Sequence, residues 1–148
     1  MFKQTYLIVL CLCLSSATFA QQVADPNFET KVAHPVYTKN GPKVLFDEAH
    51  NNFHTAGGRY KPFADLITSD GYQVTPNKEK FSAQVLKGFD ILVISNALGA
   101  PQMNMPEAAN PAFTDAECDA VRDWGERWRR SAVDCRSCAD GIGESDSR

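Results

Sequence analysis

Three short apolar runs, each bounded by charged residues, glycine or proline, recur along the middle of the chain. The first, Val44 to Phe46, is continuous and ends at two acids, which is typical of a buried parallel strand. The second, at 72–77, alternates apolar and polar residues, and the third, at 89–95, contains four aliphatic residues in succession. The pattern predicts one β-strand at each position.

Helical spacing follows each of the first two runs. Between residues 60 and 71 the apolar side chains recur at near-helical intervals, and Pro62 falls in the first turn, where proline is tolerated. Gly71 is a natural end for this helix. The segment SAQVLKG, at 82–88, predicts a second and shorter helix that closes at Gly88.

A capping box opens a third predicted helix. Thr114 is placed to cap the N-terminus, and Glu117 follows three residues later. The helix extends to Trp124 and carries Cys118 on its apolar side, so we expect this thiol in the core. Strand and helix alternate three times, which predicts an α/β domain with a parallel sheet over residues 43–124.

The first 20 residues have the features of a secretory signal. Lys3 supplies the positive start, residues 6–14 form a short apolar region, and the small-x-small site at 18–20 predicts cleavage after Ala20. The apolar region is shorter than the about 20 residues that span a bilayer. We therefore expect a secreted or periplasmic protein without stable membrane insertion after cleavage, the alternative being an uncleaved anchor.

Two polar segments flank the predicted domain. Residues 21–42 contain scattered prolines and predict an extended lead-in, whereas residues 125–148 contain five arginines and no lysine. This tail holds no apolar run able to form another strand, and two interpretations stay open: a disordered tail or translation in a shifted reading frame. Cys135 and Cys138 form a CxxC pair, but neither the strand-helix context of a redox motif nor further zinc ligands accompany it.

Composition narrows the range of functions. With 148 residues, 43% hydrophobic and 22% charged, the chain fits one globular domain. Its formal net charge of −3 and the lack of a basic stripe argue against nucleic-acid binding. After the predicted cleavage three cysteines remain, an odd number that is unusual for an exported protein.

Polar residues cluster directly after the first and third predicted strands. Ligands of open α/β sheets bind beyond the carboxyl ends of the strands, and these two strands can be neighbours. We therefore predict a site for a small polar ligand on the two loops. Its candidate residues are Asp47, Glu48, His50, Asn51, Asn52, His54, Arg59, Ser95 and Asn96.

Several chemistries fit these residue types. Glu48 or His50 is a candidate general base, and Arg59 after two glycines can face an anion at a helix N-terminus. His50 and His54, four residues apart, raise the alternative of a metal site, although the asparagines and glycines around them favour a loop. Each residue also has a structural interpretation, such as Asp47 capping the next turn. The sequence does not identify a cofactor.

The stretches at 44–55, 58–74, 89–99 and 113–124 together resemble a secreted, uncharacterised branch of the class I glutamine amidotransferase-like superfamily. The resemblance implies a flavodoxin-like parallel sheet with flanking helices, incomplete here at the C-terminus because the chain departs from the pattern after Trp124. The nucleophilic cysteine of amidotransferases has no counterpart at a matching position, so glutaminase chemistry is not implied.

The function expected from the resemblance is that of an amidotransferase-like domain that binds a small polar ligand. It would be a hydrolase only in a full-length version, and this chain is expected to be inactive. The alternatives are a non-catalytic binding or scaffold module of the same fold, and a metal-binding protein.

Overall fold

The computed structural model describes residues 23–140, with side chains described from 23 to 127. The predicted signal peptide therefore lies outside the described residues, as do the side chains of Cys135 and Cys138. Within the described part of the chain, no helix combines the length and the apolar character needed to cross a membrane.

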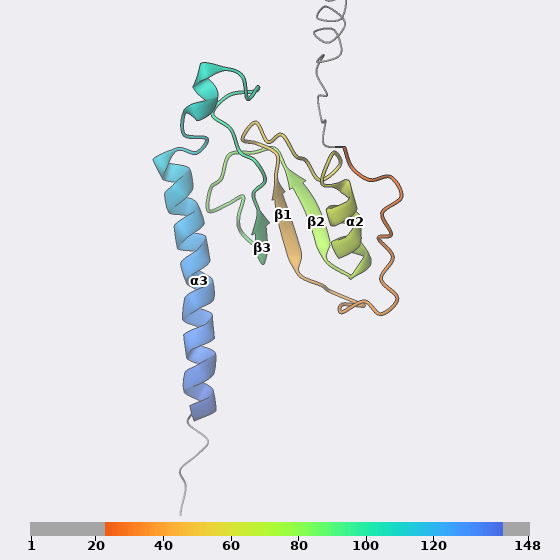
Figure 1. Cartoon of the computed structure of the whole chain (residues 1–148). Coiled ribbons are helices and arrows are strands. Elements are labelled where there is room, and N and C mark those ends of the chain that lie inside the picture. The colour runs from red at the N-terminus through yellow and green to blue at the C-terminus, as the bar shows by residue number, and fades with distance from the viewer. Residues whose placement is uncertain (1–22, 141–148) are drawn as a thin grey trace, which may run out of the picture.

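Three parallel strands form the sheet (Figure 1). They are β1 (Lys43–Asp47), β2 (Gln73–Asn77) and β3 (Ile91–Val93), in the order β2-β1-β3. Val44 stands opposite Val74 on one side and Ile91 on the other. All three strands lie where the apolar runs predicted them, and the predicted α/β class with a parallel sheet is confirmed.

The central strand is buried on both faces, as its continuous apolar run predicted. Because successive side chains of a strand point to opposite faces, Leu45 and Phe46 enter two separate clusters. Leu45 packs with Phe81 and Leu86, whereas Phe46 packs with Ala64 of the first helix and with Ala56. The sheet thus has a small hydrophobic core on each side.

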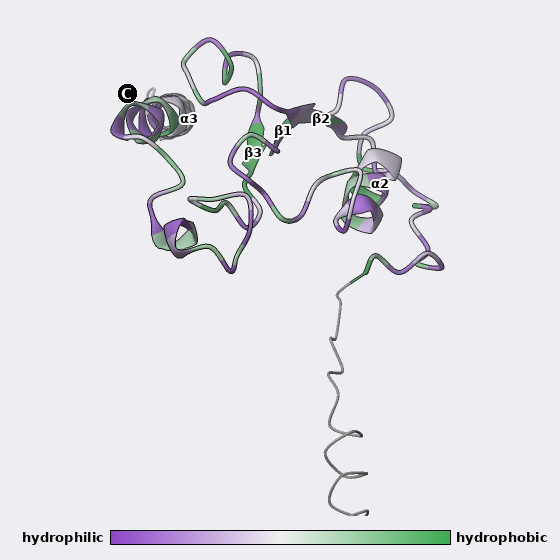
Figure 2. Ribbon diagram, turned by 90° about the horizontal axis from the view of Figure 1, so that it is seen from above, coloured by the Kyte–Doolittle hydropathy of each residue, from purple (hydrophilic) through white to green (hydrophobic). Residues whose placement is uncertain are grey.

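Two α-helices flank the sheet on opposite sides (Figures 1 and 2). Helix α2 (Lys61–Ser69) has Pro62 in its first turn and is followed by Gly71 at a φ of 97°, as predicted. Helix α3 (Asp115–Asp140) packs through Val121 and Trp124 against the Leu45 cluster. The Trp124 indole N–H also donates to the carbonyl of Phe89 at 3.3 Å.

The lead-in contains no helix or strand over residues 23–42. It lies along the end of α2, where the Tyr37 N–H donates to the carbonyl of Asp70 at 3.1 Å. Gly71 is in close contact with this segment, because a Cβ added there would lie 1.8 Å from the carbonyl oxygen of Tyr37. The left-handed conformation and this contact both require glycine at the position.

The prediction of a helix at 82–88 was wrong. The segment forms turns, with one helical hydrogen bond from the Leu86 N–H to the carbonyl of Ser82 at 3.0 Å. A single helical turn fixes several residues for one hydrogen bond, so a helix this short does not propagate. Its position is instead held by Leu86, which is completely buried in the core. A short 3-10 helix, η1 (Pro106–Ala109), is present although the sequence pattern did not predict it.

Helix α3 begins where the capping box predicted but extends beyond the predicted end at Trp124. The residues up to Asp140 include no proline and many helix-forming residues, so nothing local stops the helix. Residues 125–140 are therefore helical, whereas the sequence had left a disordered tail and a shifted reading frame open for residues 125–148. The expectation for Cys118 was also wrong, because its free thiol is on an exposed residue.

Candidate functional site

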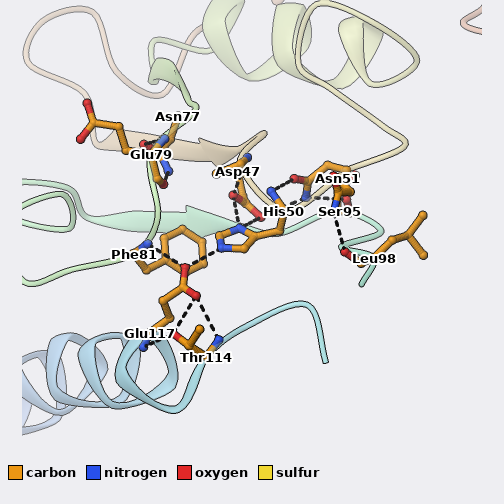
Figure 3. A network of polar contacts seen from close by, with 12 residues as sticks. Asp47, His50, Asn51, Asn77, Glu79, Phe81, Ser95, Leu98, Thr114 and Glu117 are labelled. Atoms are coloured by element: carbon orange, nitrogen blue, oxygen red, sulfur yellow. Dashed lines mark hydrogen bonds and ion pairs between the residues drawn. The ribbon is translucent and has the colours of Figure 1, made fainter. Parts of the chain in front are cut away.

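The loops that follow β1 and β3 lie side by side, as the predicted adjacency of the strands requires (Figure 3). The Leu98 N–H donates to the carbonyl of His50 at 2.9 Å, and the Asn51 amide donates to the carbonyl of Leu98 at 3.1 Å. The Asn52 amide donates to the carbonyl of Ser95 at 2.9 Å. The structure thus brings the two predicted groups of residues into one place at the carboxyl ends of the strands.

His50 is the buried centre of this region, with none of its side chain exposed. Its Nδ1 lies 2.8 and 2.9 Å from the two carboxylate oxygens of Asp47, and its Nε2 lies 2.7 Å from Oε1 of Glu117. The rings of Phe81 and Phe113 pack against the imidazole at centroid distances of 4.7 and 4.5 Å. A histidine bridging two buried carboxylates therefore joins β1 to the start of α3.

This geometry defines what the His50 ring can do. Each ring nitrogen lies within hydrogen-bond distance of a carboxylate of the protein, Nδ1 of Asp47 and Nε2 of Glu117. These contacts satisfy the polar atoms of a ring that is completely buried. A general base needs a ring nitrogen that faces the substrate, and both nitrogens of His50 face the protein. The geometry favours a structural role over the predicted catalytic one.

Glu117 accepts four hydrogen bonds. Its Oε1 accepts from His50 and from the Phe81 N–H at 3.1 Å, and its Oε2 accepts from the N–H and hydroxyl of Thr114 at 3.0 and 2.8 Å. Burial by itself raises the pKa of Glu117. The hydrogen bonds from Thr114, His50 and Phe81 outweigh burial and lower the pKa from 4.5 to about 2. The carboxylate is therefore ionised at any physiological pH.

Asp47 and Asn52 complete the cluster around His50. Asp47 also accepts from the Ala49 N–H at 3.1 Å and from the Asn52 amide at 3.0 Å, which agrees with a turn-capping role. The Asn52 side-chain oxygen accepts from the His50 N–H at 2.9 Å. The polar atoms of these residues are largely occupied within the protein, so they shape the loop and have little capacity left for a ligand.

Three other candidates are accessible to solvent. Glu48 is half-buried, and its Oε1 accepts from the Ala56 N–H at 3.0 Å. Asn51 and Asn96 are exposed, with φ angles of 51° and 48° in the left-handed region that asparagine tolerates. These side chains, one on the β3 loop and two on the β1 loop, can reach a bound molecule.

The last candidates lie towards the start of α2. His54 is 8% exposed, and its Nδ1 is buried without a hydrogen-bond partner among the described residues. Its carbonyl accepts from the Ser95 hydroxyl at 3.1 Å, so Ser95 fixes the loop. The Arg59 guanidinium lies over the Phe53 ring, 3.9 Å from its centroid. Among the described side chains, His50 and His54 included, no group of three acids, histidines or cysteines is arranged to hold a metal ion.

A groove of about 310 Å³ opens beside the cluster, between the end of β3 and α3. It is predominantly apolar, and the oxygens of Glu117 at its wall are already hydrogen-bonded within the protein. The groove therefore offers little to a polar ligand. Its lining residues are Phe81, Ile94, Phe113, Glu117, Cys118, Val121 and Arg122.

The partner of His50 was not predicted. The sequence indicated Glu117 as part of a capping box, and that role is confirmed by its bonds to Thr114. A capping box does not reveal that the same carboxylate also binds a histidine on a distant loop. The packing of Phe81 and Phe113 on that histidine likewise had no signal in the local pattern.

Comparison of the chain with protein-family models, with curated protein sequences and with solved structures gave no match. The resemblance to class I glutamine amidotransferase-like proteins therefore remains an expectation from the sequence. The structure shows a small α/β domain with a three-stranded parallel sheet and a cluster of polar loop residues at the carboxyl ends of the strands.

Proposed function

We propose that this protein is an exported α/β domain that binds a small polar ligand on the loops after β1 and β3. The supporting observation is the strand order. From β1 the chain passes to β2, which pairs with one side of β1, and then to β3, which pairs with the other side of β1. Loops that diverge in this way mark the position where open α/β sheets bind ligands. Export is inferred from the signal-like sequence of residues 1–20.

The strand order also supports the flavodoxin-like, amidotransferase-like architecture expected from the sequence. The order β2-β1-β3 is the first part of the flavodoxin-like order. In that architecture a further strand pairs with the free side of β3. Ile91 and Ile94, which are 37% and 43% exposed, are apolar residues at this edge.

Binding is favoured over catalysis because most polar groups of the two loops are hydrogen-bonded within the protein. Asp47, His50 and Asn52 are bound to one another, whereas Asn51 and Asn96 remain accessible. A binding site requires a rigid framework that presents a few accessible polar groups to the ligand, and the mutually bonded residues provide such a framework. Hydrolysis is the second candidate function, because the half-buried Glu48 makes a hydrogen bond through Oε1 and none through Oε2 among the described residues.

Binding is tested by a ¹H–¹⁵N NMR titration of the full chain with acetate, glutamine and glucose, one at a time. We expect at least one probe to shift amide resonances at both 48–59 and 95–99. Asn96→Ala should weaken that binding, whereas Asn104→Ala, at another exposed asparagine, should leave it unchanged. If none of the probes shifts these loops, or if both variants bind alike, the proposal fails.

Hydrolysis is tested separately with p-nitrophenyl acetate and a p-nitroanilide as chromogenic probes. If the chain hydrolyses either one, Glu48→Gln should abolish turnover and keep the melting temperature, whereas the exposed Glu79→Gln should change neither. Turnover that survives in Glu48→Gln would exclude Glu48 as the base.

A further inference from the structure

We infer that the ligand is a planar aromatic carboxylate, held on a patch at the start of α2; this inference rests on the proposed function. The patch, called here the Phe53 patch, consists of the side chains of Phe53, His54, Arg59, Tyr60 and Phe63. It continues from the β1 loop, so a ligand bound there also lies next to the polar residues of that loop.

The patch presents three aromatic rings to solvent. Phe53, Tyr60 and Phe63 are 46%, 37% and 39% exposed. They are joined through the buried His54, whose ring centroid lies 5.2 Å from that of Phe53 and 4.9 Å from that of Tyr60. Tyr60 in turn contacts Phe63 edge-on at 6.3 Å. Contiguous exposed rings on a small domain indicate a contact surface for an apolar group.

The charge of the patch is positive. Arg59 lies over the Phe53 ring and forms no ion pair with any described residue. Of two carboxylates on the same segments, Asp65 pairs with Lys61, and Glu48 accepts from the Ala56 N–H through Oε1. A stacked guanidinium keeps its N–H groups in the plane of the fork, where they match a carboxylate in a bidentate geometry.

His54 adds a second, independent observation. Its Nδ1 is buried and has no hydrogen-bond partner among the described residues, a state that carries a free-energy cost. The two rings packed against it, Phe53 and Tyr60, are both partly exposed. In the proposed complex one of these rings moves aside and the nitrogen meets an oxygen of the ligand. A carboxylate between Arg59 and His54 would satisfy both groups.

The class of ligand follows from these features together. An aliphatic anion would meet Arg59 but leave the rings exposed to water, and a neutral ring would cover the rings but leave the cation unpaired. An aromatic carboxylate satisfies both requirements with one rigid molecule, so little conformational entropy is lost on binding.

The test uses benzoate as the probe, with acetate and benzyl alcohol as matched halves of the same molecule. In NMR titrations of the full chain, we expect benzoate to shift the amides of 53–63 and to bind at least about tenfold more tightly than either half. Arg59→Gln should weaken benzoate about tenfold. Lys61→Gln is the matched control, since it removes a nearby cation that is already paired with Asp65, and should leave the affinity unchanged. Phe63→Leu should weaken benzoate but not acetate.

The outcomes separate this inference from the proposed function. Equal binding of benzoate and acetate, or equal effects of Arg59→Gln and Lys61→Gln, would overturn the aromatic-carboxylate assignment. If benzoate fails while glutamine or glucose shifts the loops at 48–59 and 95–99, the assignment is wrong and the proposed function stands. If no probe shifts either region, both fail.

Discussion

Replacement of Glu117 by glutamine removes the charge that joins α3 to the sheet. Glutamine has nearly the same shape, but it has one accepting oxygen where glutamate has two. Its NH₂ group would face donors, either the His50 and Phe81 N–H groups or the two donors of Thr114. The substitution thus leaves buried donors without acceptors and leaves His50 with one carboxylate partner.

The magnitude follows from the pKa of Glu117. A carboxyl whose pKa falls from 4.5 to about 2 on folding contributes about 3 kcal/mol of stability at neutral pH. Loss of hydrogen bonds from a buried charged group independently suggests a cost of about 2–3 kcal/mol. We therefore expect Glu117→Gln to lower the free energy of unfolding by about 3 kcal/mol at pH 7.

The contribution of Glu117 to the free energy of unfolding decreases as the pH falls. Because the folded pKa lies below the unfolded one, the stabilisation by Glu117 is fully present above pH 4.5 and is lost as the pH falls towards about 2. The wild-type chain should therefore lose this component over that interval, whereas Glu117→Gln has none to lose. The difference in stability between the two proteins should shrink as the pH falls from 5 to about 3.

Urea denaturation, followed by circular dichroism at several pH values, measures this difference directly. Glu79→Gln is the control, because Glu79 is exposed and its substitution should change stability by less than about 0.5 kcal/mol. The reasoning is refuted if Glu117→Gln is as stable as the wild type at pH 7. It is also refuted if the difference between them stays constant down to pH 3.

Two further predictions concern the packing of the fold. Gly71→Ala should destabilise the protein by about 1–3 kcal/mol, because its Cβ would meet the Tyr37 carbonyl, whereas Gly57→Ala has no atom within 4 Å and should be nearly neutral in thermal unfolding. Leu86→Ala should cost about 2–5 kcal/mol in urea denaturation, because Leu86 is fully buried. Ile94→Ala, at a residue that is 43% exposed, should cost clearly less, and equal losses would contradict the assigned core.

The elements that could be predicted are those with a local signal. The strand at 44–46 is a continuous apolar run ending at acids, and its neighbours carry similar runs. The start of α3 was predicted from Thr114 and Glu117, which are only three residues apart. The shared loop region was also predicted, because the first and third strands can be neighbours and the carboxyl ends of adjacent parallel strands lie at one edge of the sheet.

The features that could not be predicted depend on distant contacts. The segment at 82–88 has helical character by composition, but burial of Leu86 fixes it as a turn. Cys118 has helical spacing with apolar residues, yet it is exposed on α3, where it lines the groove beside the end of β3. The role of His50 depends on Glu117, and no local pattern connects the two residues.

The hydrogen bond between His50 and Glu117 has a consequence for the order of folding. It joins residues 67 positions apart, whereas β1, α2 and β2 follow one another closely along the chain. Closing a longer loop has a greater entropic cost, so contacts between near neighbours form first. We therefore expect the β1-α2-β2 unit to form before α3 docks on the sheet, an order that φ-value measurements would check.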